Sequence, residues 1–251
     1  MSKERQTVLD CFKTRYIAHR GLFNNEKDAP ENTILAFMRA VEAGYGIELD
    51  VQICKDKQIV VAHDYSLKRI CGVDKEIKDL TYQELSQYKI FNSNEKIPLL
   101  SETLSAINGK VPLIVEIKTE LSHEEVCVYT AEALSTYSGV YSIQSFSPLA
   151  VGWLKRNHPE IIRGQLADNF MVNKYSNSSI ENWMLTNMIY NVKNKPDYIA
   201  YNHEFGDKKC LWFWKKILCC SLCAWTVTSQ AELDRAAKIF DILIFDSFIP
   251  N

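Results

Sequence analysis

Short runs rich in Val, Ile and Tyr alternate with helix-length segments along most of this chain, and this alternation is the feature that most constrains its fold. Consecutive strands separated by helices form parallel sheets with right-handed crossovers. Eight such units within 251 residues favour a closed (β/α)8 TIM barrel over an open doubly wound sheet. The strand candidates are Arg15–His19, Gly46–Val51, Gln58–His63, Pro112–Lys118, Gly139–Phe146, Ile161–Leu166, Tyr198–Tyr201, Leu222–Val227 and Ile242–Phe245.

Helix starts can be predicted from their capping residues. A Ser or Thr followed three positions later by Glu is typical of a capping box, and Ser before Pro is typical of a helix start. These signals occur at Thr81 with Glu84, Ser122 with Glu125, Ser229 with Glu232, and Ser147 with Pro148. A further helix is expected over Thr33–Ala43, since its apolar residues are spaced helically and Gly44 follows.

One candidate strand interrupts the regular alternation. Lys55–Gln58 has the pattern of a tight turn, so the strand Gln58–His63 is expected to be antiparallel to the one before it. Residues 64–98 then precede the next helix. No linker divides the sequence, which predicts one barrel domain over residues 1–251 with an insertion at about 55–98. Insertions that follow a barrel strand lie at the face that carries active sites.

Composition and charge argue against a nucleic-acid-binding protein and against a membrane-inserted one. With 29 basic and 31 acidic residues the formal net charge is −2, which argues against a nucleic-acid partner. The N-terminal residues lack a signal-peptide pattern, and the most apolar window, 211–227, contains two lysines, so no stable membrane insertion is expected. The eight scattered cysteines are typical of reduced thiols, and a cytoplasmic location is expected. Cys220 and Cys223 form a lone C-x-x-C motif, which is weak evidence for a metal or redox site.

Charged residues gather where the early strands end. Because side chains at positions i and i+2 of a strand share one face, each of the pairs Glu48/Asp50 and Glu116/Lys118 points to the same side. Buried carboxylates need a counter-charge, and three oxygen ligands suit a hard divalent cation, Mg²⁺ or Ca²⁺. The alternative is a structural ion network with Arg20, Lys118 and the histidines.

Two histidines accompany these carboxylates. His19 and His63 each end a predicted strand, and imidazoles titrate near neutral pH, so one can accept a proton while the other donates one. Arg20 and Lys118 present only donors, which suits a phosphate. Together these residues predict hydrolysis of a phosphoester by metal-assisted acid–base catalysis.

The sequence resembles the glycerophosphodiester phosphodiesterases, within the phosphatidylinositol phospholipase C-like phosphodiesterase superfamily, over roughly residues 15–246. Weaker matches occur around Gln144-Ser145-Phe146 and Trp225-Thr226-Val227. The motifs that carry the resemblance, in order, are His19-Arg20-Gly21, Ala29-Pro30-Glu31-Asn32-Thr33, Glu48-Leu49-Asp50-Val51, Val60-Val61-Ala62-His63-Asp64 and Ile114-Val115-Glu116-Ile117-Lys118.

The resemblance implies a TIM barrel with a small insertion after the second strand. It implies release of sn-glycerol 3-phosphate and an alcohol from a small-molecule glycerophosphodiester. The implied site residues are His19 and His63 for catalysis, Glu48, Asp50 and Glu116 for the metal, Arg20, Asn32 and Lys118 for the phosphate, and Phe146 and Trp225 for the glycerol pocket.

Three questions stay open at this point. The sequence around Asp246 departs from the family pattern, which bears on leaving-group preference. Two other activities are compatible with the motifs: a phospholipase D-like enzyme that acts on lysophospholipids or sphingolipids, and a barrel that binds phosphometabolites without catalysis. The cluster Trp212-Phe213-Trp214-Lys215-Lys216 fits either a helix packed against the barrel, which is favoured, or an interfacial anchor. Oligomeric state is not indicated.

Overall fold

The computed structural model describes residues 3–120 and 122–251, which form two compact units. One unit is the continuous segment Ala18–Tyr141. The other combines the chain up to Ile17 with Ser142–Asn251. We describe each unit by itself.

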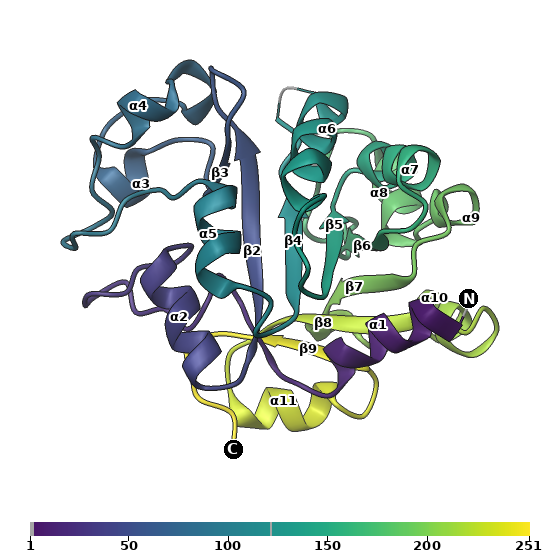
Figure 1. Ribbon diagram of the computed structural model, residues 1–251. Coiled ribbons are helices and arrows are strands. Elements are labelled where there is room, and N and C mark those ends of the chain that lie inside the picture. Colours follow the sequence, from purple (N-terminus) through teal and green to yellow (C-terminus); the bar gives the residue numbers. More distant parts are fainter. Residues whose placement is uncertain (1–2, 121) are drawn as a thin grey trace. The chain divides into compact units, whose positions relative to one another are not determined.

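The Ala18–Tyr141 unit is built around β2 (Gly46–Ile53), whose eight residues are all buried. β4 (Leu113–Ile117) pairs parallel to β2, with Asp50 opposite Glu116. β3 (Ile59–Val61) pairs antiparallel to β2 and completes the hairpin that the sequence predicts at Lys55–Gln58. The helices of this unit are α2 (Ile34–Glu42), α3 (Lys68–Cys71), the 3-10 turn η1 (Ile77–Asp79), α4 (Tyr82–Leu85), α5 (Leu100–Ile107) and α6 (His123–Leu134) (Figure 1).

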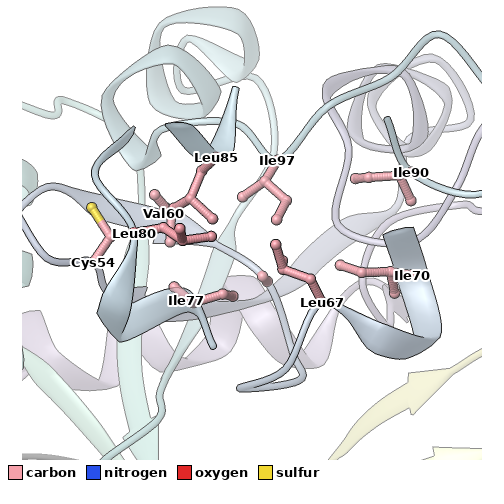
Figure 2. Packing of buried hydrophobic residues seen from close by; sticks show 10 residues of the cluster. Cys54, Val60, Leu67, Ile70, Ile77, Leu80, Leu85, Ile90 and Ile97 are labelled. Atoms are coloured by element: carbon pink, nitrogen blue, oxygen red, sulfur yellow. The ribbon is translucent and has the colours of Figure 1, made fainter. Parts of the chain in front are cut away.

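The segment between β2 and α5 has a hydrophobic core of its own. Leu67, Ile77 and Leu85 are fully buried there, and Val60 of β3 packs with them (Figure 2). Arg69 and Lys68 of α3 stand on the polar side of the same short helix, while Ile70 enters the core. This cluster explains how a segment with only short helices holds α3 in a fixed place.

The second unit consists of parallel strands separated by helices. β5 to β9 pair with one another in sequence order, each parallel to the next. Its strands are β5 (Tyr141–Ser145), β6 (Ile162–Ala167), β7 (Tyr198–Asn202), β8 (Ser221–Val227) and β9 (Ile242–Phe245). Its helices are α1 (Lys3–Lys13), α7 (Pro148–Asn157), α8 (Ser179–Thr186), α9 (Asn191–Asn194), the turn η2 (His203–Phe205), α10 (Lys209–Lys216) and α11 (Gln230–Ala236).

The strand order is β1-β9-β8-β7-β6-β5-β4-β2-β3, and β1 (Ile17–Ala18) also pairs with β2. This is the topology of a (β/α)8 barrel with β3 as an additional antiparallel strand, so the fold class predicted from the sequence is confirmed. All nine predicted strands occur. β1 is shorter than its prediction at both ends. At its C-terminal end the left-handed residues Arg20 (φ 55°) and Gly21 (φ 83°) turn the chain away.

The predicted helix starts are also confirmed, with differences in detail. Thr81 and Glu84 form the reciprocal capping box, and Ser147 caps α7 with Pro148 in its first turn. Ser229 caps α11, but the carboxylate of Glu232 accepts from the backbone N–H of Thr228 instead of that of Ser229. No helix among the described residues combines the length and the apolarity that crossing a membrane requires.

Candidate active site

Three buried carboxylates form the centre of the site. Glu48 and Asp50 alternate with apolar residues along β2, and Glu116 lies on β4 opposite Asp50, as the strand parity predicts. One oxygen from each side chain lies within 4.8 Å of the others, and all three residues are buried. The sequence therefore placed these residues on one face, and the structure brings them together.

Two cations compensate part of this charge. Nζ of Lys118 lies 3.0 Å from Oδ1 of Asp50 and donates to Oε1 of Glu116. Nε of Arg20 lies 3.4 Å from Oδ2 of Asp50. Burial opposes ionisation of Asp50, but the charges of Lys118, His63 and Arg20 hold its pKa below the usual value. The charges of Asp50 and Glu116 likewise raise the pKa of Lys118 against the effect of burial.

In the described contacts, neither Lys118 nor Arg20 brings its charged side-chain group next to the carboxylate of Glu48. Its Oε2 accepts a hydrogen bond from the backbone N–H of Arg20 at 3.2 Å and lies 4.0 Å from Nε2 of His19. Burial and the charges of Asp50 and Glu116 raise the pKa of Glu48 well above its usual value. Burial also raises the pKa of Glu116.

The donor set fits a hard divalent cation. Carboxylate oxygens are the ligands that Mg²⁺ and Ca²⁺ prefer, and the excess negative charge at Glu48 and Glu116 is what such an ion would neutralise. The alternative of a purely structural ion network accounts for Asp50, which both cations approach. In the contacts described above it offers Glu48 only the ring of His19, at 4.0 Å, while the pKa of Glu48 stays well above its usual value, so it explains the cluster incompletely.

His63 is held from two sides, by residues that the sequence analysis did not assign. Nδ1 of His63 lies 2.7 Å from Oδ1 of Asp64. The amide of Gln52, on β2, donates to the carbonyls of Ala62 and Asp64, both at 2.8 Å, and so fixes the backbone on either side of the histidine. Burial lowers the pKa of His63.

The contact with Asp64 determines which ring nitrogen of His63 carries the proton. Hydrogen bonds from Arg69 and His63 lower the pKa of Asp64 to about 2 against the effect of burial. An ionised carboxylate only accepts hydrogen bonds, so Nδ1 of His63 carries the proton in this contact. A neutral His63 therefore has its lone pair on Nε2, the atom that can accept a proton.

Glu31, which is buried, and Arg69, which is partly exposed, form a second ion network that the sequence analysis also missed. Arg69 of α3 donates to both oxygens of Glu31, at 2.7 and 2.9 Å, and to both oxygens of Asp64, at 2.6 and 3.0 Å. Nη1 of Arg20 donates to Glu31 at 2.7 Å. Burial opposes ionisation of Glu31, but the hydrogen bonds from Arg69 and the charges of Arg20 and Arg69 lower its pKa to about 2. Arg69 thus links the insertion to the groups around His63.

Asn32 and Gly21 shape the loop that follows β1. Nδ2 of Asn32 donates to Oδ2 of Asp50 at 2.9 Å, and its Oδ1 accepts from the Asp50 backbone at 3.3 Å. Asn32 therefore orients a carboxylate of the cluster. A Cβ at Gly21 would lie 2.9 Å from the backbone carbon of Ala36, and the φ of Gly21 is positive, so the turn requires glycine on both counts.

Phe146 and Trp225 belong to the other unit, where their rings meet edge to face with centroids 5.5 Å apart. The ring centroid of Phe170 lies 6.3 Å from that of Phe146. Nε1 of Trp225 is buried and makes no hydrogen bond. The two residues predicted for a glycerol pocket therefore do contact each other.

The Glycerophosphoryl diester phosphodiesterase family matches residues 19–239, a range that contains every candidate site residue. This chain belongs to that family. The match covers His19 at its start and extends beyond Trp225, so it includes both units.

Individual relatives agree with this assignment. A glycerophosphodiester phosphodiesterase of Caldanaerobacter subterraneus is 43% identical over 115 residues, which are 43% of this chain and 46% of the relative. A lysophospholipase D of Rattus norvegicus is 38% identical over 120 residues, 43% of this chain and 37% of that protein. The chain thus spans less than half the length of these two relatives.

The fold has a counterpart over nearly the whole chain. A phosphodiesterase of Oleispira antarctica, solved in complex with the product sn-glycerol 3-phosphate, covers 92% of each chain with a TM-score of 0.75 and 23% identity. At this identity the likeness supports the fold.

Proposed function

We propose that this protein hydrolyses glycerophosphodiesters to sn-glycerol 3-phosphate and an alcohol, with a divalent cation, Mg²⁺ or Ca²⁺, held by Glu48, Asp50 and Glu116. The observation that carries the proposal is the convergence of three buried carboxylates, two all-donor cations and two histidines in one unit. The family match and the product named for the Oleispira antarctica structure support the same substrate class.

The bound cation would supply Lewis-acid polarisation of the phosphoryl group. Lys118 and Arg20 present N–H donors beside the carboxylates and are suited to bind the negative oxygens of a phosphodiester. Their present partners, Asp50 and Glu31, orient them. In this proposal, phosphate recognition and metal binding are functions of neighbouring side chains.

The two histidines would divide the proton transfers. We assign proton acceptance from the attacking oxygen to Nε2 of His63, because Asp64 holds its proton on Nδ1 and burial favours the neutral ring. Proton donation to the leaving alcohol oxygen then belongs to His19, next to Glu48. The same scheme is compatible with attack by water or by the adjacent glycerol hydroxyl.

Phe146 and Trp225 remain proposed glycerol contacts. Their edge-to-face packing offers an apolar wall, and the unpaired indole N–H of Trp225 can donate to a polyol hydroxyl. We also propose a single barrel domain over residues 1–251, a cytoplasmic location and no nucleic-acid partner. All eight cysteines are free thiols, which suits a reducing compartment.

A phospholipase D-like activity on lysophospholipids is the second candidate. The name of the rat relative favours it, and so does a set of exposed apolar side chains described in the next subsection. A barrel that only binds phosphometabolites is disfavoured, because binding alone does not need a histidine held in one tautomer by Asp64.

The test is release of sn-glycerol 3-phosphate from glycerophosphocholine and from glycerophosphoethanolamine, with release of choline from lysophosphatidylcholine, which leaves lysophosphatidic acid, measured in a parallel reaction. We expect turnover of the two soluble diesters. Turnover of the lysolipid alone would replace the first candidate with the second. No turnover of any of the three, with divalent cation present, would contradict both.

A further inference from the structure

Exposed apolar side chains are confined to one unit of the molecule. Among the described residues, all fifteen exposed large hydrophobic residues lie outside Ala18–Tyr141, and twelve of the fifteen lie between residues 171 and 218. We call these residues, with the lysines between them, the 171–218 surface. Single exposed hydrophobic residues are ordinary, but such a concentration marks an interaction site.

Five of the twelve exposed hydrophobic residues of this surface are aromatic. Trp212 and Phe213 on α10 are 60% and 46% exposed, and Trp183 on α8 is 53% exposed. Leu211 and Trp214 of α10 are buried, so packing against the unit uses one side of the helix and leaves the other aromatic side open. Helix packing, the favoured sequence interpretation, therefore accounts for Trp214 and does not account for Trp212 and Phe213.

The two helices that carry these rings are neighbours. The carbonyl of Thr186, at the end of α8, accepts from the hydroxyl of Tyr201 at 3.3 Å and lies 3.8 Å from Sγ of Cys210 at the start of α10. The aromatic residues of α8 and α10 are thus held by one buried junction, although about thirty residues separate them in sequence.

The charge of this segment is opposite to that of the whole chain. Residues 171–218 contain seven lysines and four acidic residues, a net charge of +3, whereas the protein carries −2. One of the four acids, Asp197, pairs with Arg5 at 2.5 Å, and one of the seven lysines, Lys215, pairs with Asp241 at 2.8 Å, so the excess of three positive charges remains. Lys174, Lys193, Lys209 and Lys216 are exposed between the apolar residues. Tryptophan, aliphatic residues and lysine together are typical of surfaces that enter a lipid headgroup region.

We propose that the 171–218 surface docks this protein on an anionic lipid bilayer, with the aromatic side chains in the headgroup region and the lysines on the lipid phosphates. A second copy of the chain fits this surface less well. A two-fold interface would place the same patch on both partners, so that the lysines of one copy would face those of the other. An anionic bilayer supplies the complementary charge.

Vesicle flotation tests this directly, with vesicles of phosphatidylcholine alone and of phosphatidylcholine mixed with phosphatidylglycerol. We expect the protein to bind the mixed vesicles, and to bind them less at high salt. The double variant Trp212→Ser/Phe213→Ser should lower the partition coefficient at least about tenfold. The control is Ile249→Ser, which removes a side chain that is 61% exposed outside this surface and should leave vesicle binding unchanged.

A charge-reversal variant tests the same proposal even if the aromatic variant misfolds. Lys193→Glu/Lys216→Glu alters two exposed side chains and should weaken binding to the mixed vesicles severalfold, whereas Lys96→Glu/Lys110→Glu, also on exposed residues, should not. The proposal would be overturned if the wild type does not bind the vesicles. It would also be overturned if each control variant loses as much vesicle binding as the variant that it matches. Self-association that the aromatic variant abolishes, without vesicle binding, would assign the surface to a second copy.

Vesicle binding and turnover are independent readouts. Hydrolysis of soluble glycerophosphocholine is measured without vesicles, so failure of lipid docking would leave the proposed reaction standing, and failure of the reaction would leave docking standing.

Discussion

The ion network at Glu31 permits a prediction whose size follows from the structure. Glu31 is only 5% exposed, and Arg69 and Arg20 lower its pKa from 4.5 to about 2. This lowering of the pKa corresponds to about 3 kcal/mol of stability at neutral pH. Arg69 is 43% exposed, so solvent screens part of its share, and we expect Glu31→Gln to lose about 2 kcal/mol.

The loss of stability should depend on pH in the direction that a lowered carboxyl pKa requires: it should shrink as the pH falls. The ionised form of Glu31 stabilises the folded state fully above the unfolded pKa near 4.5. That contribution declines as the pH falls and disappears near pH 2. The difference in stability between wild type and Glu31→Gln should therefore be largest at pH 7 and should narrow below about pH 4.5.

Thermal unfolding monitored by circular dichroism, from pH 7 down to pH 3.5, measures this difference. At pH 7 a loss of about 2 kcal/mol corresponds to a Tm lower by roughly 4–8 °C for a chain of this size. Glu42→Gln, on an exposed residue of α2, is the matched control and should shift stability by less than about 0.5 kcal/mol. The electrostatic account would be refuted if Glu31→Gln is as stable as the wild type at pH 7. It would also be refuted if the loss of stability is equally large at pH 7 and pH 3.5.

Four further variants test catalysis, orientation and packing. His19→Ala and His63→Ala should each reduce turnover at least about 100-fold with little change in Tm, whereas His158→Ala, at the end of α7, should keep full turnover; near-native turnover in either of the first two would contradict the acid–base assignment. Asp64→Asn should lower kcat about tenfold or more with KM nearly unchanged, since it removes the acceptor that fixes the tautomer of His63, and a pure KM effect in steady-state kinetics would contradict that role. Leu85→Ala, in the fully buried core of the insertion, should cost about 2–5 kcal/mol in urea unfolding, and a loss below about 1 kcal/mol would mean that this core does not support α3.

The strands were predictable because their signals are local. Alternation along Gly46–Val51 fixes which side chains share a face, and this parity is enough to bring Glu48 and Asp50 together. The turn at Lys55–Gln58 likewise predicts the antiparallel β3. Strand ends were less predictable: β1, β3, β4 and β5 are all shorter than their predictions. β1, for example, stops just before a left-handed Arg20, a conformation that side-chain patterns do not reveal.

The residues around the predicted site were harder to assign because their contacts are distant in sequence. Glu31 and Asp64 both stand inside the motifs that carry the family resemblance, next to Asn32 and His63, and that adjacency was a usable signal. No such signal marks Arg69. It stands five positions after Asp64, on a helix of only four residues, and its partner Glu31 lies 38 positions earlier in the sequence. Only the folded insertion brings it to the site.

The central claim is that the three buried carboxylates hold a divalent cation on which hydrolysis depends. Release of sn-glycerol 3-phosphate from glycerophosphocholine, by protein stripped with EDTA and titrated with Mg²⁺ or Ca²⁺, tests it most directly. We expect activity to be lost on stripping and restored by the cation, with Glu48→Gln requiring a higher concentration for half-restoration. Full activity after stripping, or an unchanged titration in Glu48→Gln, would contradict the claim.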